Sequence, residues 1–248
     1  MFLDRLFGNK GEGEEKILKC LGADMHSHLI PGVDDGAKDY ETAFSCIAEM
    51  KRYGINKIYL TPHFQAHRYT NDEEDIKERF EKLKQKVAEQ DLGVELALAG
   101  EYLIDDGFRK RLEEPNFLTI DGKYLLVEFS FNQSMMGMEE LFFDMQMKGY
   151  EIILAHPERY IYLSESSSLL NNLKEQGVYF QANILSFAGF YGKEVKQRAY
   201  TYIEKGWIDF IGTDIHNEKY RKALVEFFEK SSNFRKILKK NTFLNNQL

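Results

Sequence analysis

Residues 23–36 read ADMHSHLIPGVDDG. The short run 23–26 ends at the first of two histidines, His26 and His28, and two adjacent aspartates, Asp34 and Asp35, follow them. The same arrangement recurs along the chain, where short apolar runs end in polar residues and are followed by segments of helical periodicity. The seven runs span 23–26, 55–61, 94–99, 124–129, 152–155, 178–182 and 208–212. Regular alternation of strands and helices predicts a parallel sheet covered by helices.

The helical segments between the runs recur at comparable spacing. We expect helices at 39–53, 73–90, 105–114, 139–147, 164–176, 194–205 and from 218 towards the C-terminus. Asp39 is predicted to cap the first helix. Chains of about 250 residues with this pattern usually fold as an open doubly wound sheet or as a closed (β/α) barrel. No G-x-G-x-x-G follows the first strand, which disfavours dinucleotide binding.

Composition narrows the class of protein. The 248 residues carry a net charge of −7 and contain no long Lys/Arg run, which disfavours nucleic acid as a partner. No apolar stretch approaches the ~18 residues of a membrane helix. Two cysteines are too few for a disulfide framework, so we expect a cytoplasmic protein. Residues 1–18 are predicted to be a flexible segment and 19–248 a single domain.

Potential metal ligands gather at the predicted strand ends. In a parallel barrel the C-terminal ends of all strands open onto one face, so residues distant in sequence converge there. The candidates are five of the six histidines and four acids: His26, His28, His63, His156, His216, Asp35, Glu101, Glu128 and Asp214. A single such residue is usually only solvated or hydrogen bonded. Nine exceed the roughly four to six ligands of one ion, so the pattern predicts two or three ions.

The order of these residues resembles the PHP (polymerase and histidinol phosphatase) superfamily: H-x-H, Asp, a lone His, Glu, Glu, His and D-x-H. The match extends from about residue 24 to 221. Four stretches resemble more narrowly the bacterial manganese-dependent protein-tyrosine phosphatases encoded with capsule and exopolysaccharide synthesis systems. They are DMHSHLIPGVDDG (24–36), TPH (61–63), AHPERY (155–160) and GTDIHN (212–217).

The resemblance implies a distorted (β/α)7 barrel of the TIM-like type, with the active site at the C-terminal ends of the strands. It also implies three divalent ions, Mn²⁺ first, with Fe²⁺ or Zn²⁺ sharing the same donors. The implied ligand sets are His26, His28 and Asp214 for one ion, Glu101 as a bridge to a second with Glu128 and His156, and Asp35, His63 and His216 for the third. Arg159 and Arg221 match phosphate-contacting arginines.

The implied reaction is hydrolysis of phosphotyrosine, on a partner tyrosine kinase with a Tyr-rich tail, by a metal-activated hydroxide. Three divalent ions against four carboxylates would leave about +2 in the pocket, which can hold a phosphate dianion in an acidic protein. The alternatives are a small-molecule phosphatase such as histidinol phosphatase, a nuclease-like enzyme, which the charge disfavours, and a metal-binding regulatory module without catalysis.

Three other features could have a functional or a purely structural role. Residues 46–52 fit C-x₅-R, the signature of cysteine-based tyrosine phosphatases, but a glycine-free helix cannot form the required phosphate loop, so Cys46 is expected in the core. In the Met-rich stretch 129–147, Leu141, Phe142 and Met145 are expected in the core, and Met135, Met136 and Met138 could bind a peptide. His67, Arg68 and Tyr69 could line the site or lie on a surface loop.

Overall fold

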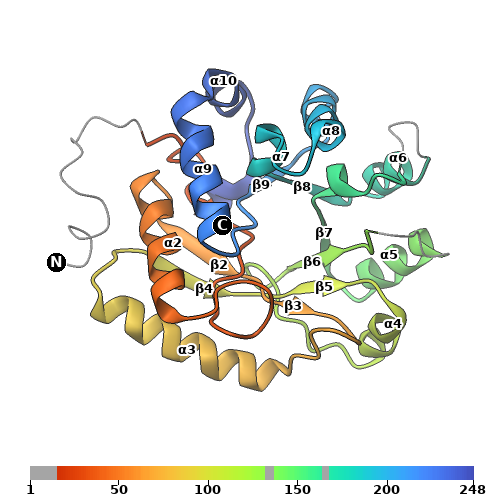
Figure 1. Ribbon diagram of the computed structural model, residues 1–248. Helices are drawn as coiled ribbons and strands as arrows, with labels where there is room; N and C mark the ends of the chain where they lie inside the picture. The colour runs from red at the N-terminus through yellow and green to blue at the C-terminus, as the bar shows by residue number, and fades with distance from the viewer. Residues whose placement is uncertain (1–15, 132–136, 164–167) are drawn as a thin grey trace.

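Strands occupy the centre of the molecule and helices surround them (Figure 1). The computed structural model describes residues 16–131, 137–163 and 168–248. The strands are β1 (Ala23–Asp24), β2 (Lys57–Leu60), β3 (His63–Phe64), β4 (Glu95–Leu98), β5 (Glu101–Leu103), β6 (Tyr124–Glu128), β7 (Glu151–Ala155), β8 (Tyr179–Asn183) and β9 (Phe210–Gly212).

The helices follow the predicted order. They are α2 (Tyr40–Arg52), α3 (Glu73–Glu89), α4 (Asp106–Glu113), α5 (Met138–Met147), α6 (Ser168–Glu175), α7 (Ile184–Ala188), α8 (Lys193–Glu204), α9 (Glu218–Lys230) and α10 (Ser232–Lys240), with 3₁₀ turns η1 (Pro157–Arg159) and η2 (Leu244–Gln247). The side chain of Asp39 accepts a hydrogen bond from the Thr42 N–H, which confirms the predicted cap. The short α7 was not predicted.

The strands pair in parallel in two ladders, β1-β2-β4 and β3-β5-β6-β7-β8-β9. The ladders are halves of the same extended segments, because β2 continues into β3 and β4 into β5. Pro62 interrupts the pairing, since it has no N–H to donate. Hydrogen bonds cross this bend from the Ala99 N–H to the Leu60 oxygen (2.9 Å) and from the Glu101 N–H to the Pro62 oxygen (3.0 Å).

The first and last strands meet and complete the ring. Ser27 and Ile215 form a parallel bridge. The His28 N–H donates to the Ile215 oxygen and the Asp214 N–H to the His26 oxygen, both at 2.9 Å. The predicted distorted seven-stranded barrel is therefore confirmed, with its seam closed by a few bonds beyond β1 and β9 and not by a full ladder.

Successive side chains along each strand point to opposite sides of the sheet. One side packs inside the barrel and forms an interior core, and the other side packs against the helices. Leu125 and Val127 of β6 belong to the core that includes the helices, whereas Tyr124 and Leu126 pack inside with residues such as Phe210. Side chains two apart on a strand share a face, so the polar residue that ends the strand points the same way as Leu126. The interior core thus forms a floor beneath the polar strand ends.

The described N-terminal residues join this core. Ile17 and Leu18 are buried, and the Leu18 N–H donates to the Tyr53 oxygen at 2.9 Å. The predicted flexible segment therefore does not extend to Ile17, because the side chains of Ile17 and Leu18 pack into the core there. Residues 1–15 lie outside the described part of the chain. Within the described ranges, no helix combines the length and the apolar character that a membrane span requires.

Candidate metal centre

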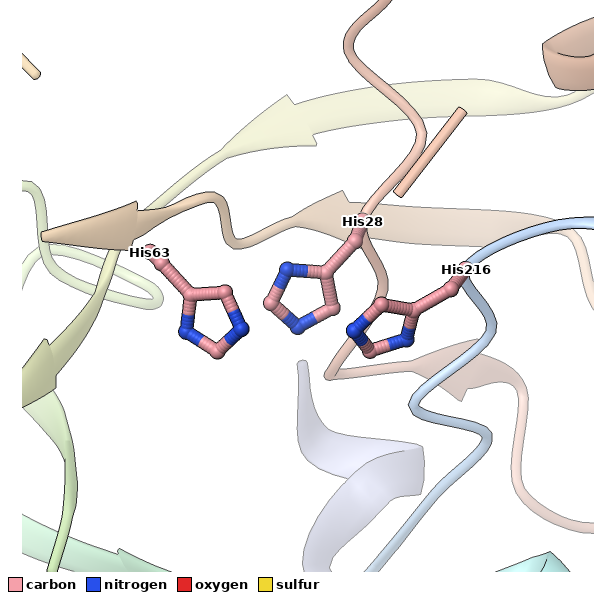
Figure 2. A group of neighbouring side chains, drawn as sticks. All are labelled: His28, His63 and His216. Carbon is pink, nitrogen blue, oxygen red and sulfur yellow. The ribbon is translucent and has the colours of Figure 1, made fainter. Parts of the chain in front are cut away.

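Imidazole and carboxylate side chains meet above the interior core. Eight of the nine predicted ligands are buried together: His26, His28, His63, Glu101, Glu128, His156, Asp214 and His216. The ninth, Asp35, lies at the edge, and 46% of its side chain is exposed. Figure 2 shows how the rings of His28, His63 and His216 approach one another from separate segments of the chain.

The first group of donor atoms lies at the seam of the barrel. The Nε2 atoms of His26 and His28 are 3.2 Å apart. Oδ1 of Asp214 is 3.4 Å from His26 Nε2 and 3.3 Å from His28 Nε2. Oε2 of Glu101 is 3.2 Å and 3.3 Å from the same two nitrogens. The four donor atoms therefore surround one small volume.

The second group shares Glu101 with the first. Oε1 of Glu101 is 3.1 Å from His156 Nε2, and its Oε2 is 3.0 Å from His63 Nδ1. Glu128 contacts both imidazoles, at 3.2 Å from His63 Nδ1 and 3.9 Å from His156 Nε2. Glu101 thus offers an oxygen to each group, which is the position that a bridging carboxylate requires.

The third group lies towards solvent. Oδ1 of Asp35 is 3.5 Å from His63 Nε2 and 3.7 Å from His216 Nε2. His63 turns one nitrogen towards this group and the other towards Glu101 and Glu128. The neutral ring has one lone pair, so it can serve either group but not both.

Hydrogen bonds at the second nitrogen orient three of the imidazoles. Nδ1 of His28 donates to Asp34 Oδ2, Nδ1 of His26 to Gln181 Oε1, and Nδ1 of His216 to the main-chain oxygen of Asp214, each at 2.9 Å. Because these partners accept a hydrogen, a neutral ring carries its proton on Nδ1 and turns the Nε2 lone pair inwards.

This donor set fits divalent cations. Glu101 Oε2 has no hydrogen-bond partner among the described residues, although three imidazole nitrogens lie within 3.3 Å. Converging lone pairs and buried carboxylates repel one another unless protons or metal ions lie between them. Burial opposes charge on His26, but the Glu101 and Asp214 carboxylates outweigh it and raise the pKa of His26. The cluster therefore attracts positive charge, and its oxygen and nitrogen donors suit Mn²⁺, Fe²⁺ or Zn²⁺.

Two of the cluster residues have a left-handed backbone. His156 has φ +36° and Asp214 has φ +51°. Residues other than glycine rarely adopt this region, and such strain is concentrated at functional sites. In β7, Ile153 and Ala155 point inwards, so regular alternation would turn residue 156 outwards. The unusual φ accompanies the reversal that brings the His156 ring into the cluster.

Arg159 is the cation next to this cluster. Its Nη1 donates to Asp214 Oδ2 at 3.0 Å, and its guanidinium lies 4.4 Å from the Phe131 ring centre and 4.3 Å from that of Tyr191. Burial opposes its charge, but Asp214 outweighs this effect and raises the pKa of Arg159. The side chain therefore stays charged, and its exposed fraction of 20% faces a cavity.

The cavity opens over the cluster and has a volume of about 280 Å³. Its polar lining includes Asp35, Glu128, His156, Arg159, Asp214 and His216, and its apolar lining includes Leu103, Phe129 and Phe131. A phosphate bound beside Arg159 would therefore contact the proposed metal ligands directly.

The predicted accessory residues divide into two groups. Arg68 lines the cavity, with Nη2 4.0 Å from Asp35 Oδ2, and the Tyr69 ring stacks on His63 at 5.3 Å. His67 is exposed and bonds Asp106. Arg221 is not part of the cavity lining: it pairs with Glu218 and with the buried Glu49, at 2.8 Å each.

Sequence reasoning missed several residues that support the cluster. The side chain of Asp34 is buried and accepts hydrogen bonds from His28, the His63 N–H and the Gly36 N–H. Asn183 Nδ2 donates to Asp214 Oδ2 at 2.6 Å, and Gln181 bonds His26. Asp34 adds a fifth carboxylate, so three divalent ions would leave about +1 and not about +2 before Arg159 is counted. Two features of the sequence could have indicated these residues: the adjacent acids in VDDG (33–36) and the two polar residues on one face of the strand in QAN (181–183).

The two remaining sequence features are structural among the described residues. Cys46 is fully buried in α2, and burial, with the Glu218 charge, raises the pKa of its thiol to about 12. It therefore cannot supply a thiolate nucleophile near neutral pH. Met138, Leu141, Phe142 and Met145 are buried, so the proposed peptide-binding role of Met138 is wrong for this conformation. Met135 and Met136 lie outside the described residues.

Known proteins are similar in sequence to this chain over most of its length. A family model described as "Capsular polysaccharide synthesis, CpsB/CapC" matches residues 22–240. The tyrosine-protein phosphatase YwqE of Bacillus subtilis is 34% identical over 199 residues, which cover 80% of this chain and 78% of YwqE. The tyrosine-protein phosphatase CpsB of Streptococcus pneumoniae is 29% identical over 200 residues, or 78% of this chain and 82% of CpsB.

Solved structures agree with the sequence matches. A structure from the work on YwqE of Bacillus subtilis and CpsB of Streptococcus pneumoniae, described as "unique metal-dependent tyrosine phosphatases", has a TM-score of 0.76 and 30% identity. The match covers 91% of this chain and 94% of that one. A phosphotriesterase homology protein from Escherichia coli has a TM-score of 0.55 at 14% identity, over 89% of this chain and 92% of that one, and shares the fold.

The contact between Asp34 and His28 yields a first prediction. In Asp34→Asn, the amide keeps the volume but loses the charge that orients and polarises the imidazole, so metal affinity should fall about 10- to 100-fold. Calorimetric titration with Mn²⁺ measures it. Asp106→Asn, at an exposed carboxylate that bonds His67 and lies outside the cluster, is the matched control and should bind as the wild type does. Equal affinities in all three proteins would refute the orienting role.

The burial of Cys46 yields a second prediction. Cys46→Ser should keep phosphatase activity within about twofold of the wild type, because the thiol lies inside α2 and has no part in metal-based hydrolysis. Turnover of p-nitrophenyl phosphate with Mn²⁺ measures the activity, and thermal denaturation measures the cost of a buried hydroxyl, about 1–3 kcal/mol. Loss of turnover in a variant that still folds would revive the cysteine mechanism.

Proposed function

Because the chain belongs to the capsular polysaccharide synthesis family CpsB/CapC, we propose that it is a metal-dependent protein-tyrosine phosphatase. One observation carries the proposal. Glu101 Oε2, unbonded among the described residues, is the meeting point of the imidazoles of His26, His28 and His63, and His63 and Arg159 both line the adjoining cavity. Such a site can hold divalent ions and a phosphate dianion together.

The proposed ligands are the nine residues of the sequence pattern. The donor groups support one ion at His26, His28 and Asp214, a second at Glu128 and His156 with Glu101 between the two, and a third at Asp35, His63 and His216. We propose three ions, Mn²⁺ in the first place and Fe²⁺ or Zn²⁺ as alternatives with the same donors. When bound, such ions act as Lewis acids towards phosphate and make water a nucleophile near neutral pH.

The protein's own contribution is to bind and orient the phosphate. Among the described residues the Arg159 guanidinium bonds only Asp214, so other N–H donors remain for a phosphate oxygen. A planar guanidinium suits this role, because it can form two parallel bonds to phosphate. Asn183 and Arg159 together hold one oxygen of Asp214, which leaves the other directed at His26 and His28.

The natural setting is also part of the proposal. The family description supports a role in capsular or exopolysaccharide synthesis, with phosphotyrosine on a tyrosine autokinase tail as the substrate. A kinase tail of this type would place the enzyme in the cytoplasm. We propose one catalytic domain, which the sequence places at 19–248 and which also includes the buried Ile17 and Leu18. A strand ring from Ala23 to Gly212 supports this proposal, because its interior core contains residues at both the first and the last strands.

Substrate and metal dependence are tested together. The purified protein with Mn²⁺ should hydrolyse a phosphotyrosine peptide far faster than the same peptide with phosphoserine, histidinol phosphate or single-stranded DNA. Chelation should abolish turnover, and added Mn²⁺ should restore it, because the donors cannot activate water alone. Phosphate release and elemental analysis are the measurements. Turnover of histidinol phosphate well above that of phosphopeptide would replace the proposed substrate.

The two predicted arginines should behave differently. Arg159→Ala removes the cavity-lining cation that bonds Asp214 of the cluster, so kcat/KM should fall about 10²- to 10³-fold with unchanged metal content. Arg221→Ala should chiefly lower the melting temperature, because it removes one of the two arginines, Arg221 and Arg52, that pair with the buried Glu49 carboxylate.

Steady-state kinetics and thermal denaturation of both variants separate these effects. If Arg221→Ala lost activity as severely as Arg159→Ala while melting normally, the phosphate-contacting role inferred from the resemblance would apply to both arginines.

A further inference from the structure

An aromatic side chain stands exposed at the rim of the cavity. Phe131 follows β6 and has 40% of its surface exposed. Four large apolar side chains of the described residues are exposed to this degree or more: Phe131, Phe143, Met147 and Ile161. Phe131 is the member of this group that lines the cavity. A single exposed apolar side chain is ordinary on a protein surface, but Phe131 lies at the mouth of a charged cavity, where a bound ligand would contact it.

The ring of Phe131 is exposed to solvent on one side and contacts the buried cluster on the other. It stacks against His156, whose own exposed fraction is 1%, with the ring centres 5.5 Å apart. The Arg159 guanidinium lies 4.4 Å from its centre. A phosphate bound by Arg159 would therefore place the group esterified to it next to Phe131.

We propose that Phe131 recognises the aromatic ring of phosphotyrosine and so gives the site its preference for aryl phosphates. This inference rests on the proposed function and assigns a residue to its selectivity. The edge or face of an aromatic ring packs favourably against another ring, and such contacts are worth about three- to tenfold in affinity. Leu103, on another strand, adds apolar surface to the cavity.

The burial of the cluster supports the same selectivity. At the floor of the cavity Glu128, His156 and Asp214 are each exposed by 2% or less, while Phe131 reaches solvent. A phosphate must therefore stand away from the peptide backbone to reach the floor. Phosphotyrosine carries its phosphate beyond a rigid ring, whereas in phosphoserine a single methylene separates the ester oxygen from the backbone. The ring that provides the length is the group that Phe131 would contact.

A different role would also explain the position of Phe131. The ring could serve only to hold the Arg159 guanidinium, in which case it would affect every phosphate ester equally. Recognition of the substrate ring predicts instead a loss confined to aromatic esters. The pair benzyl phosphate and cyclohexylmethyl phosphate separates these effects, because both release an aliphatic alcohol and differ mainly in whether the ring is aromatic.

The experiment compares Phe131→Leu, Phe131→Tyr and Phe143→Leu with the wild type, all loaded with Mn²⁺. Phe143 is the matched control, an exposed phenylalanine on α5 that is not part of the cavity lining. Phe131→Leu should lower kcat/KM about five- to tenfold for benzyl phosphate and for a phosphotyrosine peptide, and less than twofold for cyclohexylmethyl phosphate. Phe131→Tyr and Phe143→Leu should keep the wild-type ratio of the two esters.

Equal losses for both esters in Phe131→Leu would overturn the inference and leave a role in holding Arg159. Unchanged kcat/KM for both esters in that variant would overturn it as well. Thermal denaturation checks that each variant folds, and Phe131→Tyr tests ring recognition without removing the ring.

Binding without turnover separates this inference from the proposed function. Calorimetry with phenylphosphonate and methylphosphonate, which are not hydrolysed, should show tighter binding of the phenyl compound by the wild type. Phe131→Leu should reduce that difference about three- to tenfold. A protein that shows this ring preference but does not hydrolyse phosphotyrosine would refute the proposed function alone. A protein that hydrolyses phosphotyrosine without any ring preference would refute the role of Phe131 alone.

Discussion

The convergence of buried carboxylates and imidazole lone pairs is the constraint on which the rest of the site depends. Glu101 has no exposed surface, and it faces His26, His28 and His63 with an oxygen that has no hydrogen-bond partner among the described residues. Such an arrangement is unfavourable unless positive charge lies within it. The divalent ions that we propose would provide that charge, and a loaded centre with a small positive excess would then attract a phosphate dianion into a protein of net charge −7.

The barrel makes this arrangement possible, because its interior core packs beneath the cluster and its strand ends surround the cluster. Interior residues such as Leu126 and Phe210 form an apolar floor, and the polar side chains are the next residues along the same faces. The seam between β1 and β9 is closed by main-chain bonds of His26, His28 and Asp214, so the residues that would bind an ion also hold the ring together. Mutations at the seam should therefore affect the fold and the site together.

The surroundings of the cluster determine which chemistry it can perform. Arg159 brings a permanent charge to the cavity and is itself held between Phe131 and Tyr191. The alternative signature at Cys46 has no such environment, since its thiol is buried in α2 with a pKa of about 12. Two phosphatase motifs therefore coexist in the sequence, and burial decides between them. The rim of the cavity adds apolar contacts above the charged cluster, which favours an aromatic ester.

The sequence by itself determined the order of strands and helices and the donor types at the strand ends, because both follow from local periodicity and from residues such as His26 and His28 two apart. Tertiary structure decided what local patterns do not encode. The inward position of the His156 ring beside Glu101, the hydrogen bond from Asn183 to Asp214, and the pairing of Arg221 with Glu49 all depend on contacts between distant segments. Residues far apart in sequence acquire these roles only when the ring closes, since closure fixes their distances and removes water from between them.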